Sequence, residues 1–215
     1  MMRSKLLSAV AFLAATLVAA PASAQVVSLG TPSGLLGPTQ NYTTARGTVI
    51  VSGFNGTTPI NLFGKNNGGD EVGVGLSNDT TGQHEIQSTA SNFVQLDVSG
   101  LSAGTLLSFL MGSTTAGETW QVLATNTADC YMCGTLAATG TDEGMWHSLG
   151  VPTTTYFDFY AIGTSLGAPS NVLLGSLNVS AVPEPAAWVM MLLGFGAIGM
   201  AARRSRRNVA LAQLA

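Results

Sequence analysis

The chain has 215 residues, of which only 9% are charged, and its formal net charge is −3. Six of its eight basic residues lie near the two ends, so Arg46 and Lys65 are the only basic residues between positions 25 and 181. Ten acidic residues share that stretch, which therefore has a net charge of −8, and this excludes nucleic acid as a partner because nucleic acid requires a basic surface.

Residues 1–24 have the pattern of a secretory signal peptide. Arg3 and Lys5 form a positive segment, an apolar run extends from Leu6 to Ala20, and Ala22-Ser23-Ala24 is a small-residue cleavage site. We therefore expect the chain to be exported across the inner membrane.

Residues 25–181 show the two-residue period of β-strands. Val94, Leu96 and Val98, for example, alternate with Gln95 and Asp97. The predicted strands are Thr48 to Ser52, Ile60 to Phe63, Val72 to Leu76, Val94 to Val98, Leu106 to Met111, Trp120 to Thr125, Tyr156 to Ala161 and Val172 to Val179.

Glycine, asparagine and serine clusters separate these segments, and none of the stretch has a helical period. The stretch therefore lacks the helices that would connect the strands of a parallel sheet. The pattern predicts an all-β fold, a single β-sandwich or jelly-roll-like ectodomain over residues 25–181.

Four carboxylates, Asp70, Glu71, Asp79 and Glu85, lie close together in the sequence. Carboxylate oxygens suit calcium, although the spacing does not match an EF-hand loop. The alternative, which we favour, is that these side chains form turn hydrogen bonds and solvate a strand edge, with no cofactor.

Cys130 and Cys133 are the only cysteines. In an exported protein two thiols most often form a disulfide, here within a tight loop. Zinc would need two further ligands, and the only histidines are His84 and His147. A redox function would normally require a thioredoxin-like α/β context, which the strand pattern lacks.

No catalytic motif is evident, so we expect that the protein is not an enzyme. The main alternative is a glycosidase-type, carbohydrate-active enzyme on a β-sandwich scaffold, in which two carboxylates face one another across a cleft. Candidates for such a pair are Glu71, Glu85, Glu118 and Glu143, and His147 beside Trp146 could line a sugar site.

The C-terminal tail combines three signals. Pro183-Glu184-Pro185 interrupts regular structure. Residues 186–202 are uncharged, and their length is at the short end of the range for a membrane-spanning helix. A basic cluster follows, made of Arg203, Arg204, Arg206 and Arg207. Such a basic cluster stays on the cytoplasmic side of a membrane.

This order of motif, apolar helix and arginine stop resembles the PEP-CTERM sorting signal, in the variant with a tryptophan, Trp188, after the second proline. The resemblance covers residues 182–207 and leaves a short tail, 208–215. It implies recognition by a membrane-embedded protease of the exosortase type in a Gram-negative bacterium that makes exopolysaccharide.

The sequence thus predicts a membrane-anchored precursor that is processed at its C-terminal motif and reaches the cell surface or extracellular matrix. We expect the ectodomain to be a structural or binding component of the envelope or exopolysaccharide matrix, present in biofilm. The carbohydrate-active enzyme and a calcium-dependent adhesive module remain the alternatives.

Overall fold

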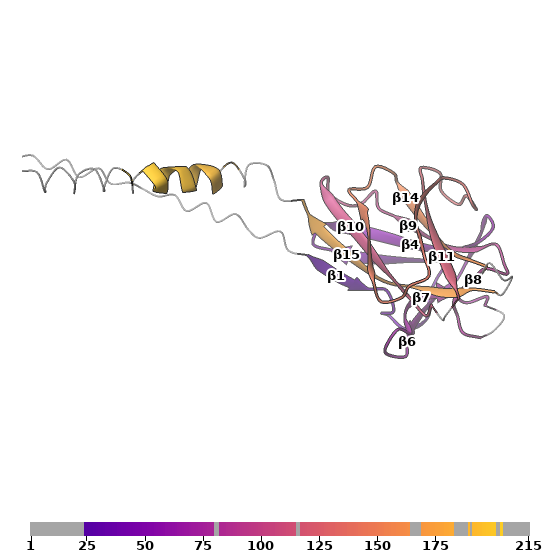
Figure 1. Cartoon of the computed structure of the whole chain (residues 1–215). Coiled ribbons are helices and arrows are strands. Elements are labelled where there is room, and N and C mark those ends of the chain that lie inside the picture. Colours follow the sequence, from indigo (N-terminus) through magenta and orange to yellow (C-terminus); the bar gives the residue numbers. More distant parts are fainter. Residues whose placement is uncertain are drawn as a thin grey trace, which may run out of the picture. The chain divides into compact units, whose positions relative to one another are not determined.

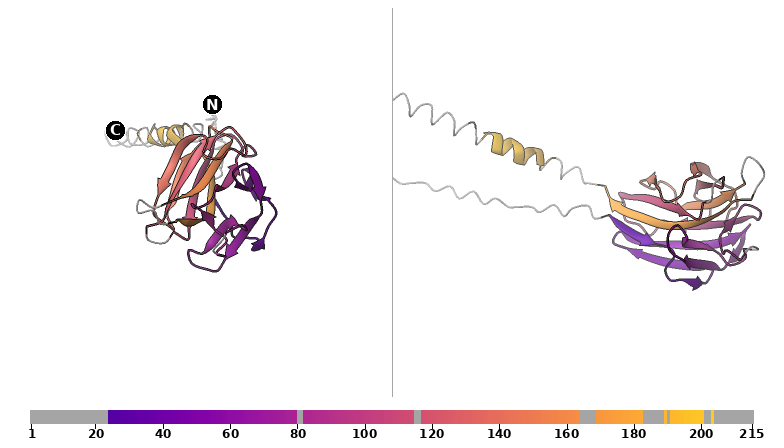
Figure 2. Two further views of the ribbon diagram at one scale, coloured as in Figure 1. Left: turned by 90° about the vertical axis from the view of Figure 1, so that its right-hand side faces the viewer. Right: turned by 60° about the horizontal axis from the view of Figure 1, so that its bottom comes forward.

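The computed structural model describes residues 24–79, 82–114, 117–163, 169–182, 189, 191–200 and 203. Residues 24–182 form two antiparallel sheets, whose layers are visible in Figure 1 and, from two further directions, in Figure 2. The predicted all-β sandwich is confirmed. No helix occurs among the described residues of this domain.

The eight-stranded sheet is built around the longest strand, β15 (Asn171–Ala181). In spatial order the sheet contains β13 (Trp146–Gly150), β10 (Thr105–Gly112), β15, β7 (Val72–Leu76), β6 (Leu62–Asn66) and β2 (Gly34–Leu35), while β1 (Gln25–Ser28) and β8 (Ile86–Gln87) also pair with β15.

The seven-stranded sheet forms the second layer. Its order is β12 (Thr135–Gly140), β11 (Thr119–Thr125), β14 (Tyr156–Ile162), β9 (Asn92–Asp97), β4 (Gly47–Asn55) and β3 (Thr39–Thr44), and β5 (Thr58–Ile60) pairs with β4.

The main core lies between the sheets and follows from the two-residue period. On β10, for example, Leu107, Phe109 and Met111 are buried, because alternate side chains of a strand point to the same face. Phe109 packs edge-on against Trp120 and Phe159 of the opposite sheet, with ring centroids 5.4 Å and 5.1 Å away. Such aromatic pairs contribute packing area and a favourable geometry.

The predicted strand from Ile60 to Phe63 is wrong in one respect, because the chain changes sheets within it. β5 ends at Ile60 in the seven-stranded sheet, and β6 begins at Leu62 in the eight-stranded sheet. Ile60 packs partly buried against the main core and Leu62 is fully buried in it, so the hydrophobic pattern alone did not reveal the crossover.

Both ends of the domain lie at the same place in the fold. β1 pairs with the end of β15, with Gln25 opposite Val179, so the chain enters and leaves the sandwich side by side (Figure 1). The connections to residues 1–23 and to the C-terminal segment therefore start from adjacent positions.

Candidate functional site

The strand β6 positions the first group of candidate residues. Leu62 on β6 and Val74 and Leu76 on the paired strand β7 are buried in the main core. The alternation of a strand therefore directs Phe63 and Lys65 to the outer face of the eight-stranded sheet. Lys65 is nevertheless only 5% exposed, because neighbouring segments cover it.

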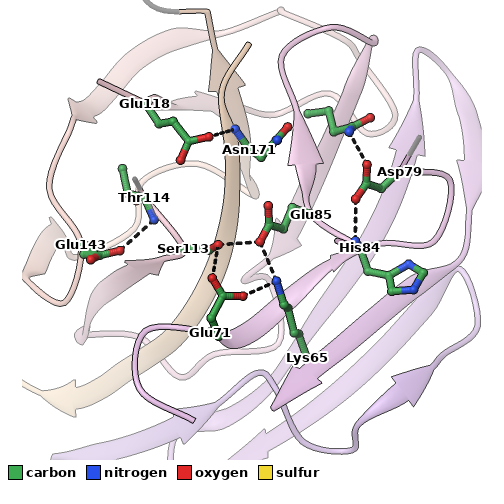
Figure 3. A network of polar contacts seen from close by, with 11 residues as sticks. Lys65, Glu71, Asp79, His84, Glu85, Ser113, Thr114, Glu118, Glu143 and Asn171 are labelled. Atoms are coloured by element: carbon green, nitrogen blue, oxygen red, sulfur yellow. Dashed lines mark hydrogen bonds and ion pairs between the residues drawn. The ribbon is translucent and has the colours of Figure 1, made fainter. Parts of the chain in front are cut away.

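Lys65 is held by two carboxylates, as Figure 3 shows. Its Nζ lies 2.7 Å from Glu85 Oε1 and also forms an ion pair with Glu71. The Ser113 hydroxyl, which follows β10, lies within hydrogen-bond distance of both carboxylates, 2.7 Å from Glu71 Oε1. One cation and one hydroxyl thus bridge two acids from different loops.

The charges in this network stabilise one another. Burial tends to lower the pKa of Lys65, but hydrogen bonds and the negative charges of Glu71 and Glu85 outweigh it and raise that pKa. For Glu71, burial tends to raise the pKa, but hydrogen bonds from Lys65 and Ser113 and the lysine charge lower it overall. We therefore expect Lys65 and Glu71 to remain charged at neutral pH.

Residues 82–85 cover the outer face of β7 because that strand carries a glycine there. A Cβ on Gly75 would lie 2.0 Å from the carbonyl oxygen of His84, so no other residue permits this close approach. His84 itself has a positive φ of 60°, and its backbone N–H donates to the Asp79 carboxylate at 2.6 Å. Asp79 also accepts a hydrogen bond from the side-chain amide of Gln87.

The ring of His84 lies flat on the ring of Phe63, with centroids 3.8 Å apart and planes 18° from parallel. A pocket of about 310 Å³ opens beside this stack. Its walls include Phe63, Lys65, Asn66, Asn67, Gln83 and His84.

The four predicted calcium candidates are divided among different partners. Glu71 and Glu85 contact Lys65, whereas Asp79 binds the His84 backbone and Gln87. Asp70 is exposed, and its backbone carbonyl accepts the Ser113 N–H at 2.9 Å. Within the ranges that the structure describes, no group of three or more acidic, histidine or cysteine residues could hold a metal ion.

The other two glutamates considered for catalysis bind backbone groups. Glu118 accepts the N–H of Asn171 at 2.9 Å, and Glu143 accepts the N–H of Thr114 at 2.9 Å (Figure 3). Both contacts fix the ends of strands or loops.

The sequence also singled out His147 and Trp146. Nε2 of His147 lies 2.8 Å from Asp142, and its ring packs against Phe109 and Trp120. Trp146, in contrast, is 43% exposed on the strand β13. The two neighbours therefore face opposite sides of the sheet.

A second buried acid, which the sequence did not reveal, lies on the outer face of the seven-stranded sheet. Asp158 on β14 is 0% exposed and accepts hydrogen bonds from the Gln95 amide at 2.8 Å and the Tyr160 hydroxyl at 3.4 Å. Burial raises its pKa to about 7, against the opposing effect of these bonds and with a small addition from the charge of Asp129. Among the described residues, no ion pair joins Asp158 to a basic side chain.

The cysteine loop covers Asp158. Cys130 and Cys133 form a disulfide in the structure. The Met132 N–H donates to the Tyr160 hydroxyl oxygen at 2.9 Å, and the Tyr131 ring packs on that of Tyr160 with centroids 5.7 Å apart. Residues 126–134, which we name the disulfide loop, thus close a small second core that contains Phe54, Phe93, Leu123 and Tyr160.

Sequence reasoning missed Lys65, Ser113 and Asp158 as members of buried networks. One signal was available for Lys65, because it is one of only two basic residues among ten acidic ones in this domain. No local pattern marks Ser113 or Asp158, since Ser113 bonds to Glu85, 28 residues away in the sequence, and Asp158 bonds to Gln95, 63 residues away.

The fold and the tail together define an exported protein with an all-β domain and a C-terminal sorting segment. The family model for the PEP-CTERM protein-sorting motif matches residues 181–207 and begins at the last residue of β15. This motif marks a secreted protein that is sorted and processed by an exosortase, a membrane enzyme, through a C-terminal membrane-anchoring signal. No curated protein and no solved structure matches the chain.

Most of the sorting segment lies outside the described residues. This applies to Pro183, Glu184, Pro185 and Trp188, to Arg204, Arg206 and Arg207, and also to residues 1–23 of the predicted signal peptide. Residues 189, 191–200 and 203 are helical. Counting only these described positions, no helix reaches the length and hydropathy of a membrane span.

Proposed function

We propose that the sandwich is a structural or binding component of the cell envelope or exopolysaccharide matrix of a Gram-negative bacterium. The observation that carries the proposal is the sorting motif at residues 181–207, which follows the last strand of the sandwich without an intervening domain. A sorting signal next to the sandwich delivers this domain to the cell exterior.

The proposal assigns no reaction to the domain. A glycosidase needs two carboxyl groups that face one another across a cleft. Here Glu71 and Glu85 are bridged by one lysine and one serine, and Glu118 and Glu143 bind backbone N–H groups. These contacts support structural functions for the four acids.

Cosedimentation with the host's own exopolysaccharide tests the proposal. The exported protein, purified from the host, should pellet with the polysaccharide in a saturable manner, whereas the same protein unfolded in urea and diluted should not. Retention in the supernatant at every polysaccharide concentration, together with an unaltered matrix in a strain that lacks the gene, would contradict it.

Processing is tested separately with Glu184→Ala. If the central acid of the motif is recognised, this variant should accumulate as a longer, membrane-retained precursor, while the native chain appears in a shorter form. A host without the sorting protease is the control, and it should retain the native chain as the same precursor. Equal sizes for the native chain in both hosts would show that no cleavage depends on that protease.

A further inference from the structure

We propose that the pocket beside the Phe63–His84 stack binds a neutral sugar unit of a glycan. This inference rests on the proposed function and specifies the part of the domain that contacts the matrix. The volume of the pocket, about 310 Å³, is at the lower end of the range of small-molecule sites and suits one sugar ring.

The chemistry of the walls favours a sugar. Sugar hydroxyls both donate and accept hydrogen bonds, and side-chain amides do the same. Asn66, Asn67 and Gln83 present three such amides from two segments, and all three residues are exposed. The stacked rings of Phe63 and His84 add a flat, partly exposed surface for the apolar face of a sugar ring.

Two features of His84, which lines the pocket, each cost folding free energy. Its φ of 60° is uncommon for a residue other than glycine, and the Asp79 carboxylate fixes it. In addition, its Nδ1 is buried without a hydrogen-bond partner among the described residues. Such costs are concentrated at ligand sites, where the surrounding structure holds a group ready for binding.

Electrostatics favour a neutral glycan over an acidic one. Lys65 is the one cationic side chain among the residues that line the pocket, and its ammonium group already contacts Glu71 and Glu85. The domain as a whole carries a net charge of −8, so a polyanion would be repelled.

The test uses two probes, the neutral and the uronate-containing oligosaccharides released from the host's exopolysaccharide by partial acid hydrolysis. Binding of each fraction to the exported protein is measured by calorimetric titration. We expect the neutral fraction to bind and the uronate-containing fraction to bind at least tenfold more weakly.

Two variants locate the site. His84→Asn removes the ring while asparagine still tolerates a positive φ, and it should weaken binding at least tenfold. Asn66→Ala removes one amide and should weaken binding several-fold. Asn41→Ala is the matched control, because Asn41 is an exposed asparagine on β3 of the opposite sheet, and it should bind like the native chain.

The outcomes separate this inference from the proposed function. Equal affinity of the native chain and all three variants, or preference for the uronate-containing fraction, would overturn the pocket assignment. If those same preparations still cosediment with the whole exopolysaccharide, the proposed function stands without the pocket. Binding of the neutral fraction that is lost in His84→Asn would support the pocket. If the native chain then fails to cosediment and the matrix of a strain that lacks the gene is unaltered, the matrix function is overturned while the pocket stands. Melting temperatures of the variants within a few degrees of the native value exclude unfolding as the cause.

Discussion

The outer faces of both sheets bury a carboxylate, but the two carboxylates have different kinds of partner. Each outer face is covered by a loop that buries a carboxylate, Glu85 over the eight-stranded sheet and Asp158 under the disulfide loop of the seven-stranded sheet. Glu85 is buried together with a lysine, whereas Asp158 receives only hydrogen bonds from neutral groups. The pKa values of two acids reflect this difference. For Glu71 beside Lys65, burial tends to raise the pKa, but the hydrogen bonds from Lys65 and Ser113 and the lysine charge lower it overall, whereas burial raises the pKa of Asp158 to about 7.

Removal of the cation should have the largest effect. Lys65→Met leaves Glu85 buried without its counter-charge, and loss of one partner of a buried pair costs about 3–5 kcal/mol of unfolding free energy. Urea denaturation measures this difference. Arg46→Met is the matched control, because Arg46 is the other basic residue of the domain and bonds to Thr105 and the Ala103 carbonyl near the surface. Equal losses in the two variants would refute the importance of the buried pair.

The second prediction concerns the acid without a cation. The pKa of Asp158 in the folded domain, about 7, is above its ordinary value of 3.8, so the folded state binds more protons between these values. The unfolding free energy should therefore fall as pH rises from about 4 to 7, by at most about 1.4 kcal/mol per pH unit and by up to about 4 kcal/mol in all.

Denaturation at a series of pH values checks this slope. Asp158→Asn should flatten it, because the buried group no longer titrates. Asp97→Asn, on the neighbouring strand β9 and partly exposed, should leave the slope unchanged. A domain that is equally stable at pH 4.5 and pH 7.5 would show that Asp158 is not buried as described.

The disulfide loop should contribute less. The bond closes a loop of only four residues, so the chain-entropy model gives a stabilisation of about 2 kcal/mol or less. The double variant Cys130→Ser/Cys133→Ser should still fold, and its pH slope should be shallower because water reaches Asp158 more easily. Ready alkylation of both cysteines in the native chain without a reductant would contradict the disulfide itself.

Calcium should have the smallest effect. Since Glu71 and Glu85 already contact Lys65 and Asp79 binds the backbone of His84, calcium should change the melting temperature no more than magnesium or sodium chloride at equal ionic strength. A bound ion would instead raise the melting temperature with its concentration. A rise of several degrees that is specific to calcium and lost in Asp70→Asn would overturn this expectation.

The strand pattern predicted the sandwich well where one face of a strand is buried. Val72 to Leu76 was predicted as a strand and is β7, and the segments around Leu107, Val122 and Leu177 are strands of the core. The polar edge strands β3 and β12 were missed, because residues such as Gln40, Asn41 and Thr139 do not alternate with enough apolar residues. Their pairing to a neighbour, rather than their own composition, makes them strands.

The sorting motif was predictable from its local order of residues, and the family match at residues 181–207 confirms it. The polar networks were not, because they depend on tertiary contacts. Ser113 reaches Glu85 only after β10 and the loop before β8 are both in place, and Gln95 reaches Asp158 only when β9 pairs with β14. A sequence shows that such residues exist but not which of them meet.

The placement of β15 has a mechanical consequence. While the chain is held by its C-terminal segment, any load on the domain enters through Ala181 and runs along this strand. β15 is paired with β10 from Ala181 to Leu173 and with β1 from Val179 to Ser176. Antiparallel hydrogen bonds are perpendicular to the strands, so a pull along β15 shears them all together instead of opening them one after another. The domain should therefore withstand a pulling force on its C-terminal end better than a domain tethered through an edge hairpin.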